Sequence, residues 1–277
     1  MKKYIKWIWK NIGFCIFIIT VTVILVTIIH MLTFDSIIDY KNISFSSPKI
    51  PAELNGYKIA FVTDTHSISE NKLQNVVKKL NDKKIDLLVL GGDYTSLNES
   101  PVRIIKALSE VKATDGIYGV DGNHDNYSEL SAAFEEYSVN LLSNSGLYIQ
   151  KNFYFAGVDD LWNRNPNIAT ATKESFNDDF VLLVSHNPDV TMLQDTTGVD
   201  LILSGHTHGG QVTLFYMWAP IFDFNNVITK YGNRFRSGWS LSKDDVPVYV
   251  SNGTGQDSFR TFCRPQVIIL TLSHELK

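Results

Sequence analysis

Polar residues that can bind metals or transfer protons recur at five places in the chain. Each group directly follows a short apolar run, in the segments FVTDTH, LVLGGD, GVDGNHD, LLVSH and LILSGHTH. These segments contain Asp64, His66, Asp93, Asn123, His124, Asp125, His186, His206 and His208. Carboxylates, imidazoles and amide oxygens bind hard and borderline divalent cations, and this set is too large for one four-coordinate ion. Two ions about 3.5–4 Å apart that share one carboxylate would use them all.

Each motif taken alone has an ordinary structural explanation, such as a turn or a hydrogen-bonded histidine. Five of the seven histidines nevertheless follow apolar runs, and His30 and His274 are expected to have no chemical role. A Ser-His-Asp hydrolase is disfavoured because the chain has no Gly-x-Ser-x-Gly segment. A metallo-β-lactamase-like site is also disfavoured, because the segment HTHGGQ replaces the pattern H-x-H-x-D-H.

The apolar runs before these motifs predict the strands of a buried, largely parallel sheet. They cover residues 57–63, 85–91, 116–120, 180–185 and 199–205. Apolar residues at helical spacing predict helices around residues 73–80, 104–111 and 130–137. Alternation of strands and helices indicates an α/β domain. Ligands of open α/β sheets bind beyond the carboxyl ends of the strands, so the five motifs are expected to converge.

The N-terminal residues predict a membrane anchor. Residues 1–10 contain four lysines, whereas residues 11–34 contain no Asp, Glu, Lys or Arg. About 20 apolar residues cross a bilayer, and this run exceeds the ~7–15 residues of a signal-peptide core, with no A-x-A-like cleavage site after it. The lysines predict a cytoplasmic N-terminus, with Trp7 and Trp9 at the membrane interface. A single-pass cell-membrane protein follows, with a tether over residues 35–56 and an extracytoplasmic domain over residues 57–277.

Composition narrows the remaining function classes. The chain is 44% hydrophobic and 19% charged, with a formal net charge of −4 and no long basic block, so no nucleic-acid partner is expected. Its two cysteines are Cys15, inside the predicted anchor, and Cys263. Neither a disulfide within the domain nor a cysteine-based zinc site is therefore expected.

The ordered set D-x-H, G-D, G-N-H-D, H and G-H-x-H resembles the signature of the calcineurin-like metallophosphoesterases, from about Tyr57 to Leu272. The segments SHNPD, SGHTHGGQ and SNGTG, followed by FRTFCRP, are similar to the YkuE-like branch of membrane-associated phosphodiesterases. The resemblance implies a four-layer αββα sandwich behind the N-terminal transmembrane helix. It also implies two divalent ions, of manganese, zinc or iron.

Carried over to this chain, the resemblance implies a role for each polar residue. One metal ion would be bound by Asp64, His66 and His208, and the other by Asn123, His186 and His206, with Asp93 bridging them. A water or hydroxide between the metals would be the nucleophile. His124 is then expected to stabilise or protonate the leaving oxygen, and Asp125 to orient His124. Gly122 is expected to permit the tight turn that this crowding needs.

The expected function is hydrolysis of a phosphodiester or pyrophosphate bond in a lipid-linked or nucleotide-linked envelope precursor. The alternative is a metal-binding envelope interaction protein without turnover, which the complete ligand set and His124 disfavour. Two interpretations of the aromatic segment 213–238 remain open. It forms either a packed cover or an apolar wall for a lipid or nucleoside, with Arg234, Arg236 or Arg260 available for phosphate. Residues 253–255, GTG, are expected to form a turn between the last strands.

Overall fold

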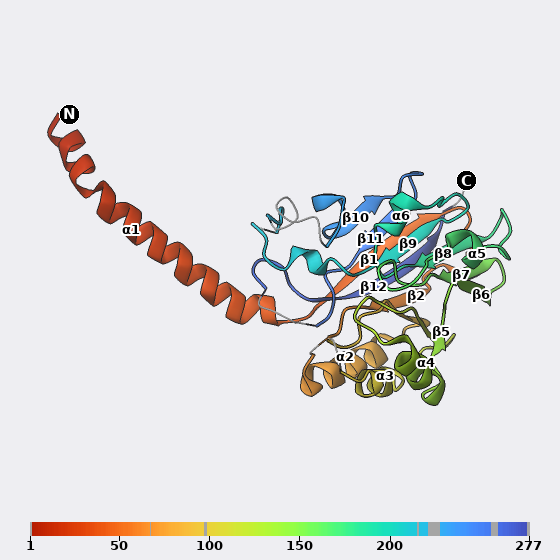
Figure 1. Ribbon diagram of the computed structural model, residues 1–277. Helices are drawn as coiled ribbons and strands as arrows, with labels where there is room; N and C mark the ends of the chain where they lie inside the picture. The colour runs from red at the N-terminus through yellow and green to blue at the C-terminus, as the bar shows by residue number, and fades with distance from the viewer. Residues whose placement is uncertain are drawn as a thin grey trace.

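The computed structural model describes residues 2–66, 68–96, 99–214, 216–220, 228–255 and 260–275. One long helix, α1 (Lys2–Thr33), extends away from a body that contains two six-stranded sheets (Figure 1). Within α1 and the turn after it, residues Trp9–Ser36 are long and apolar enough to cross a membrane, with a mean hydropathy of 3.0. The most apolar 18 residues of this stretch are not buried against the body.

The first sheet supplies three of the five strand ends that carry the polar motifs. Its strands, in order across the sheet, are β1 (Asp39–Ser47), β12 (Gln266–His274), β2 (Lys58–Val62), β3 (Leu87–Leu90), β4 (Ile117–Gly119) and β5 (Asn140–Leu141). Neighbouring strands are parallel except for the pair β12 and β2. The carboxyl ends of β2, β3 and β4 therefore lie at one edge.

The second sheet supplies the other two. Its strands, in order, are β10 (Gly238–Leu241), β11 (Pro247–Val250), β9 (Leu201–Ser204), β8 (Phe180–Val184), β7 (Phe153–Gly157) and β6 (Ser145–Gln150). The pairs β10–β11 and β6–β7 are antiparallel, and the others are parallel. All five strands predicted from the sequence are present, each within the predicted range.

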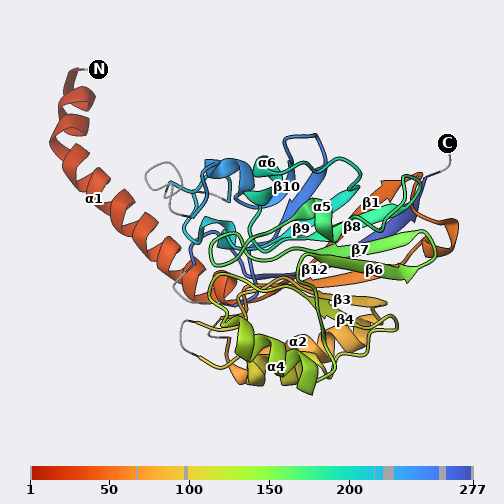
Figure 2. The same ribbon diagram turned by 45° about the vertical axis from the view of Figure 1, so that its right-hand side comes forward.

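The sheets pack face to face, with helical layers outside them (Figure 2). Buried residues from both sheets, including Phe61, Val89, Phe155 and Leu182, form the core between them. The outer face of the first sheet is covered by α2 (Glu70–Lys83), α3 (Val102–Leu108) and α4 (Tyr127–Glu136). The thinner layer on the second sheet contains α5 (Ile168–Ala171) and α6 (Val190–Leu193). The expected αββα sandwich is confirmed, as are the three predicted helices.

Short 3-10 turns complete the described elements. They are η1 (Phe34–Ser36), η2 (Ala52–Leu54), η3 (His208–Gly210) and η4 (Gly232–Phe235). Among them, η3 contains one of the predicted metal-binding histidines and follows β9 directly. This position ties the local geometry of His208 to the end of a buried strand.

The segment predicted as a tether instead belongs to the folded body. Residues Asp39–Ser47 form β1, which pairs in parallel with β12 along its whole length. Its Ile43 and Phe45 side chains pack against the core between the sheets. The prediction was wrong because the intervening polar residues face outward on an edge strand, and a half-buried alternation resembles a polar linker.

The foot of α1, its last turn together with η1, is docked onto the body. The buried Asp35 carboxylate accepts hydrogen bonds from the backbone N–H groups of Phe262 (2.8 Å) and Cys263 (3.2 Å). His30 contacts the same carboxylate at 2.8 Å through Nδ1 and the Tyr216 hydroxyl at 2.7 Å through Nε2. His30 therefore has a structural role, and no flexible linker separates α1 from the body.

Candidate metal centre

The predicted metal-binding residues converge at the carboxyl edges of both sheets. Two groups of side chains place their ligand atoms within 4.8 Å of one another. The first contains Asp64, His66, Asp93 and His208, and the second contains Asp93, His186 and His206. Asn123 joins the second group, because its Oδ1 atom lies 3.1 Å from His186 Nε2 and 2.7 Å from His206 Nδ1. The Asp93 side chain is the member common to both groups.

Backbone carbonyl groups fix the proton positions on three of the histidines. His66 Nδ1 lies 3.2 Å from the Thr95 carbonyl, and His186 Nδ1 lies 2.8 Å from the Gly91 carbonyl. On His206 the corresponding atom is Nε2, which lies 2.9 Å from the Ile228 carbonyl oxygen. A carbonyl oxygen only accepts, so each of these ring nitrogens carries a proton, and the other nitrogen of a neutral ring presents a lone pair to the cluster.

The atoms that face the interior of the cluster are consequently hydrogen-bond acceptors. His186 Nε2 lies 3.2 Å from Asp93 Oδ2, and His66 Nε2 lies 3.6 Å from the same oxygen. His66 Nε2 and His208 Nε2 are 3.1 Å apart. Lone pairs at these separations repel unless a positive charge lies between them. The donor set is therefore chemically suited to divalent cations, and its nitrogen and oxygen atoms suit manganese, zinc or iron.

Burial and charge adjust these groups for cation binding. Burial, together with the nearby charge of His186, lowers the pKa of His206 to about 3. Burial likewise holds the pKa of His208 well below its usual value. Burial opposes a charge on Asp93, but its contacts with His186 and His66 hold the pKa of this carboxyl well below its ordinary range. His206 and His208 thus present neutral imidazoles, and Asp93 presents an ionised carboxylate.

The backbone at these positions is strained. Positive φ angles occur at Asp64 (51°), His66 (38°), Asp93 (53°), His206 (70°) and His208 (51°). Left-handed backbone is uncommon for residues other than glycine, and such outliers cluster at functional sites. The surrounding fold therefore maintains several unfavourable backbone conformations in the cluster.

Glycines permit the close approach of the loops that carry the carboxylates. A Cβ atom at Gly122 would lie 2.3 Å from Asp93 Oδ1, and one at Gly205 would lie 2.3 Å from Asp64 Oδ2. Glycine is therefore required at position 122 because the Asp93 carboxylate leaves no space for a side chain. Residues 253–255 form a loop between β11 and β12, where the N–H of Gly255 donates to the Asp64 carbonyl at 2.8 Å.

Asp125 does not orient the His124 side chain as predicted. Its carboxylate accepts hydrogen bonds from the backbone N–H groups of Asp93 (2.8 Å), Tyr94 (2.9 Å) and Gly122 (2.8 Å). The Nδ1 atom of His124 has no hydrogen-bond partner among the described residues. Adjacent residues in a tight loop point in different directions, so Asp125 braces the backbone around Asp93 instead.

His124 faces open space beside the cluster. Its backbone N–H donates to Asp93 Oδ1 at 2.8 Å, which fixes the residue next to the shared carboxylate. The side chain lines a cavity of about 390 Å³ together with polar residues that include Asn123, Glu129 and Asn163. Its ring is perpendicular to that of His66, with centroids 5.1 Å apart. His124 is thus placed to contact a ligand without belonging to either ligand group.

Sequence reasoning missed residues 158–164, which follow β7. The Asn163 side chain donates to the Asn123 carbonyl, and the Trp162 ring meets the His206 ring edge-on with centroids 4.6 Å apart. Arg164 forms an ion pair with Asp159 at 3.0 Å. A signal was available, because FYFAGVDD is another apolar run that ends in carboxylates.

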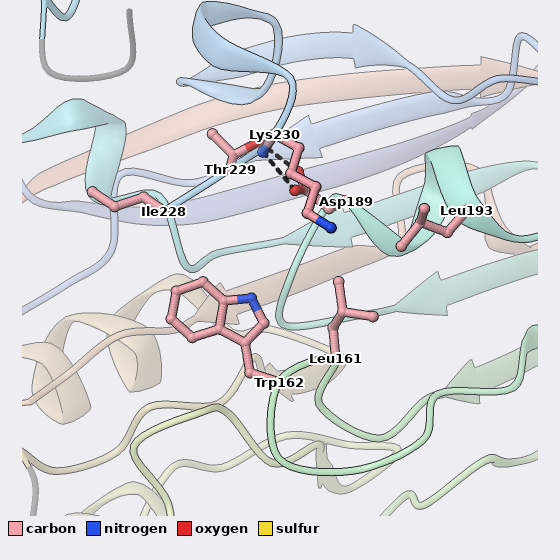
Figure 3. Close-up of a pocket in the computed structure, with 7 residues that line it drawn as sticks. All are labelled: Leu161, Trp162, Asp189, Leu193, Ile228, Thr229 and Lys230. Carbon is pink, nitrogen blue, oxygen red and sulfur yellow. Dashed lines mark hydrogen bonds between the residues drawn. The ribbon is translucent and has the colours of Figure 1, made fainter. Parts of the chain in front are cut away.

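A second cavity, of about 380 Å³, is drawn in Figure 3. Two of its lining residues, Trp162 and Ile228, contact His206, so the cavity adjoins the cluster on that side. Leu161, Trp162, Leu193 and Ile228 surround it, and the side chain of Lys230 extends into it from the opposite wall. The Asp189 carboxylate in its wall accepts hydrogen bonds from the Thr229 hydroxyl and the Lys230 N–H. The cavity is therefore mainly apolar, with a cationic side chain at one wall.

The three arginines proposed for phosphate are engaged with the backbone. Arg260 is buried and donates to the carbonyls of Gly255 (2.9 Å) and His208 (3.2 Å). Arg236 donates to the Tyr216 carbonyl at 2.8 Å, and Arg234 to the Leu241 carbonyl at 2.9 Å. These contacts favour structural roles. Phe215 and residues 221–227 of the aromatic segment lie outside the described residues.

Comparison with known proteins agrees with this geometry. The family model named calcineurin-like phosphoesterase matches residues 57–210. A metallophosphoesterase of Campylobacter jejuni is 26% identical over 84% of this chain and 63% of its own length. The metallophosphoesterase YkuE of Bacillus subtilis is 26% identical over 83% of both chains. A transmembrane protein with a metallophosphoesterase domain from Danio rerio is 28% identical over 75% of this chain and 50% of its own length.

The chain thus spans roughly half to two thirds of the length of the first curated relatives it matches, at 63% and 54%. Among solved structures, TT1561 of Thermus thermophilus aligns with a TM-score of 0.49 and 14% identity, over 72% of this chain and 90% of its own. The matched family region contains all the residues of both ligand groups.

Metal binding is predicted to release protons near neutral pH. Burial opposes a charge on His186, but Asp93 at 3.2 Å overcomes this and raises the pKa of His186 well above its usual value. In the metal-free protein this pair stabilises the fold below a pH of about 6.5, and the contribution is lost as the pH rises through the raised pKa. A metal ion must displace that proton.

Calorimetric titration of the metal-free protein with manganese, in buffers of different ionisation enthalpy, measures this release. We expect a positive proton count that disappears in His186→Ala, and an affinity that rises with pH. An observed enthalpy that is independent of the buffer would show that His186 is already neutral.

Proposed function

Because the chain belongs to the calcineurin-like phosphoesterases, we propose that it hydrolyses a phosphodiester or pyrophosphate bond at the candidate metal centre. The observation that carries this proposal is the ring of acceptor atoms around Asp93, in which the Nε2 atoms of His66 and His208 face each other. Such a site stabilises positive charge, and positive charge stabilises a phosphoryl group during displacement.

We assign the ligands to two ions of manganese, zinc or iron. Asp64, His66 and His208 would bind one ion, and Asn123, His186 and His206 the other, with Asp93 shared. When bound, such a pair supplies an activated water and neutralises charge on the phosphoryl oxygens. Asn123 binds through a neutral oxygen, so the protein neutralises less of the cationic charge.

His124 acts on the substrate in this proposal. It lies beside Asp93 and lines a cavity, and its buried Nδ1 atom has no hydrogen-bond partner among the described residues. A histidine so placed can hold a proton at the departing ester oxygen, which assists cleavage of a poor leaving group. Asp125 contributes indirectly, since its three backbone hydrogen bonds hold the loop of Asp93 and Gly122.

We further propose that the substrate belongs to the cell envelope and is lipid-linked or nucleotide-linked. The support is the short path from the anchor to the metal centre. Asp35 at the foot of α1 binds the backbone of Cys263, and Cys263 Sγ lies 3.3 Å from the carbonyl oxygen of His208. A site this close to an apolar helix suits substrates that are held in a membrane.

A metal-binding interaction protein without turnover is the competing function. It requires the ligand groups but gives no reason for His124 to face a cavity. Hydrolysis of bis-p-nitrophenyl phosphate by the full metal-loaded chain discriminates between the two, because only the hydrolase releases p-nitrophenol. Monoesters, diesters and lipid pyrophosphates tested next would define the substrate class.

The residue roles predict two different failures. His124→Ala should keep its metals yet lose on the order of 10²–10⁴ in rate for diesters with poor leaving groups, because it removes a proton donor. Asp93→Asn should lower metal content and activity together, because it weakens the carboxylate common to both ligand groups. Elemental analysis and steady-state kinetics of both variants measure these effects.

Substrates with a good leaving group provide the internal control, since they need little protonation and should be less affected in His124→Ala. Two metals at wild-type occupancy in Asp93→Asn would refute the bridging role. If His124→Ala lowered only metal content, His124 would be the metal ligand, and Asn123 would have the role that we assign to His124.

The four N-terminal lysines predict that the catalytic body faces away from the cytoplasm. Protease added to protoplasts or spheroplasts should therefore digest the body, and a C-terminal alkaline phosphatase fusion should be active. A protected body with a silent fusion would place the site in the cytoplasm. That result would reject an envelope substrate while leaving the metal assignment intact.

A further inference from the structure

We propose that the cavity beside His206 is a substrate subsite for an apolar or aromatic group that carries a second negative charge. This inference rests on the proposed phosphoesterase function and specifies its substrate class. The cavity volume of about 380 Å³ corresponds to on the order of a dozen water molecules, at about 30 Å³ each. An aromatic ring with one phosphate group fits within that volume.

The cavity shares a wall with the metal centre. The Trp162 ring contacts His206, and the Ile228 carbonyl accepts the Nε2–H of the same histidine. A substituent on a phosphoryl group bound beside His206 therefore enters a space lined by Trp162 and Ile228. Residues 161–163 separate this space from the polar cavity of His124, so the two sides of a phosphoester meet different surroundings.

The lining selects the chemistry of the ligand. Trp162 is 47% exposed and Leu193 is 51% exposed, so both present apolar surface that a bound group would cover. Lys230 projects into the same space and forms no ion pair among the described residues. Aromatic surface favours a planar or aliphatic group. The Lys230 ammonium, whose charge also acts on the Asp189 carboxylate in the wall, favours an anion such as a second phosphate.

Three probes separate these contributions in the full metal-loaded chain. Methyl p-nitrophenyl phosphate has one charge and no large substituent, bis-p-nitrophenyl phosphate adds an aromatic ring, and diadenosine pyrophosphate adds a ring and a second charge. Trp162→Ala should raise KM roughly three- to tenfold for the last two only, because the lost contact is with their aromatic groups. Lys230→Met should raise KM about tenfold for the pyrophosphate alone.

Trp239→Ala is the matched control, because Trp239 is also 47% exposed but lies on β10 away from the cavity. Lys173→Met serves the same purpose for charge, since Lys173 lies on the surface beside Glu174. Equal effects of Trp162→Ala and Trp239→Ala would overturn the subsite. So would a loss confined to kcat with the methyl ester, which would indicate that Trp162 only supports His206.

Calorimetric binding of diadenosine pyrophosphate distinguishes this proposal from the proposed function. Binding that depends on Trp162 and Lys230 but gives no turnover would retain the subsite and reject the hydrolase. Turnover of all three probes that is unaffected by either variant would retain the hydrolase and reject the subsite.

A separate observation concerns the apolar side chains beside α1. We infer that Val212, Leu214, Tyr216, Met217 and Trp218 form a membrane-contact loop that rests on the bilayer. Their exposures range from 38% for Trp218 to 74% for Met217, which is unusual for neighbouring large apolar residues. This inference depends on the proposed membrane anchoring of α1.

The loop is continuous with the apolar helix α1, so we infer that the bilayer covers the loop. The Tyr216 hydroxyl contacts His30 at the foot of α1, and Phe34 beside it is 56% exposed. The loop lies on the side of the body from which α1 emerges (Figures 1 and 2). Tyr and Trp favour the membrane interface, where an apolar ring meets polar headgroups.

Hydrogen bonds connect the described residues of the loop to the candidate metal centre. The Leu214 N–H donates to the Trp218 carbonyl at 2.8 Å, which closes a turn that presents Met217. Arg236 binds the carbonyls of both Tyr216 and Gly209, and Gly209 follows the predicted ligand His208. Contact between this loop and lipid would therefore bring the metal centre toward the membrane surface.

The test uses the full chain in phosphatidylcholine vesicles, with Cys15→Ser as background. Met217→Cys and Phe176→Cys provide single labelling sites of equal exposure, 74%, and only the first lies beside α1. Cys263 is buried and does not compete for label. A polarity-sensitive fluorophore at position 217 should shift to the blue and be quenched by spin-labelled lipid, whereas one at position 176 should do neither.

Equal, weak quenching at both positions would overturn the membrane contact. A blue shift at position 217 that depends on protein density but not on spin-labelled lipid would indicate that a second copy covers the loop, which also overturns it. Flotation after an alkaline wash tests the anchor independently. Protein that floats without quenching at position 217 leaves the anchor intact, and protein that does not float rejects both.

Discussion

The repulsion among acceptor atoms around Asp93 is the constraint on which the rest of the site depends. Asp93 Oδ2 faces the Nε2 atoms of His66 and His186, and Asn123 Oδ1 faces two imidazole nitrogens. Without positive charge this arrangement is unfavourable, so it must be stabilised by the surrounding fold, by the proton that His186 shares with Asp93 or by a bound cation. The backbone carbonyls behind the rings prevent them from rotating away, because rotation would leave a buried N–H group unpaired.

The two-sheet architecture allows this concentration of acceptors. Asp64, Asp93 and Asn123 follow strands of the first sheet, whereas His186 and His206 follow strands of the second. Neither sheet alone contains a complete ligand set. Packing of Phe61 and Val89 against Phe155 and Leu182 brings the two edges together, so the apolar core stabilises the polar cluster. The left-handed backbone at the strand ends is the local cost of bringing the loops this close.

The sequence predicted the convergence of the candidate ligands better than their surroundings. Strand ends could be located because buried runs such as 180–185 and 199–205 are continuous and apolar, and a parallel sheet aligns their carboxyl ends. The edge strand β1 was missed because its alternation resembles a polar linker. The role of Asp125 was mispredicted because neighbours in sequence need not face each other, and the three N–H groups it binds depend on loop geometry. Contacts from residues 158–164 depend on packing between the sheets, which sequence spacing does not encode.

The docking of α1 joins the position of the site to its chemistry. Asp35 is buried and binds the backbone at Phe262 and Cys263, and the Cys263 thiol and the Arg260 guanidinium both reach the His208 carbonyl. Buried polar groups are costly to leave without hydrogen-bond partners. Displacement of the helix foot would remove Asp35 from the N–H groups of Phe262 and Cys263, close to the predicted metal ligand His208. A flexible tether would have isolated α1 from the site. With β1 folded into the sheet and Asp35 buried, α1 and the loop of His208 form one continuous structure, and the orientation of the helix constrains that of the candidate metal centre.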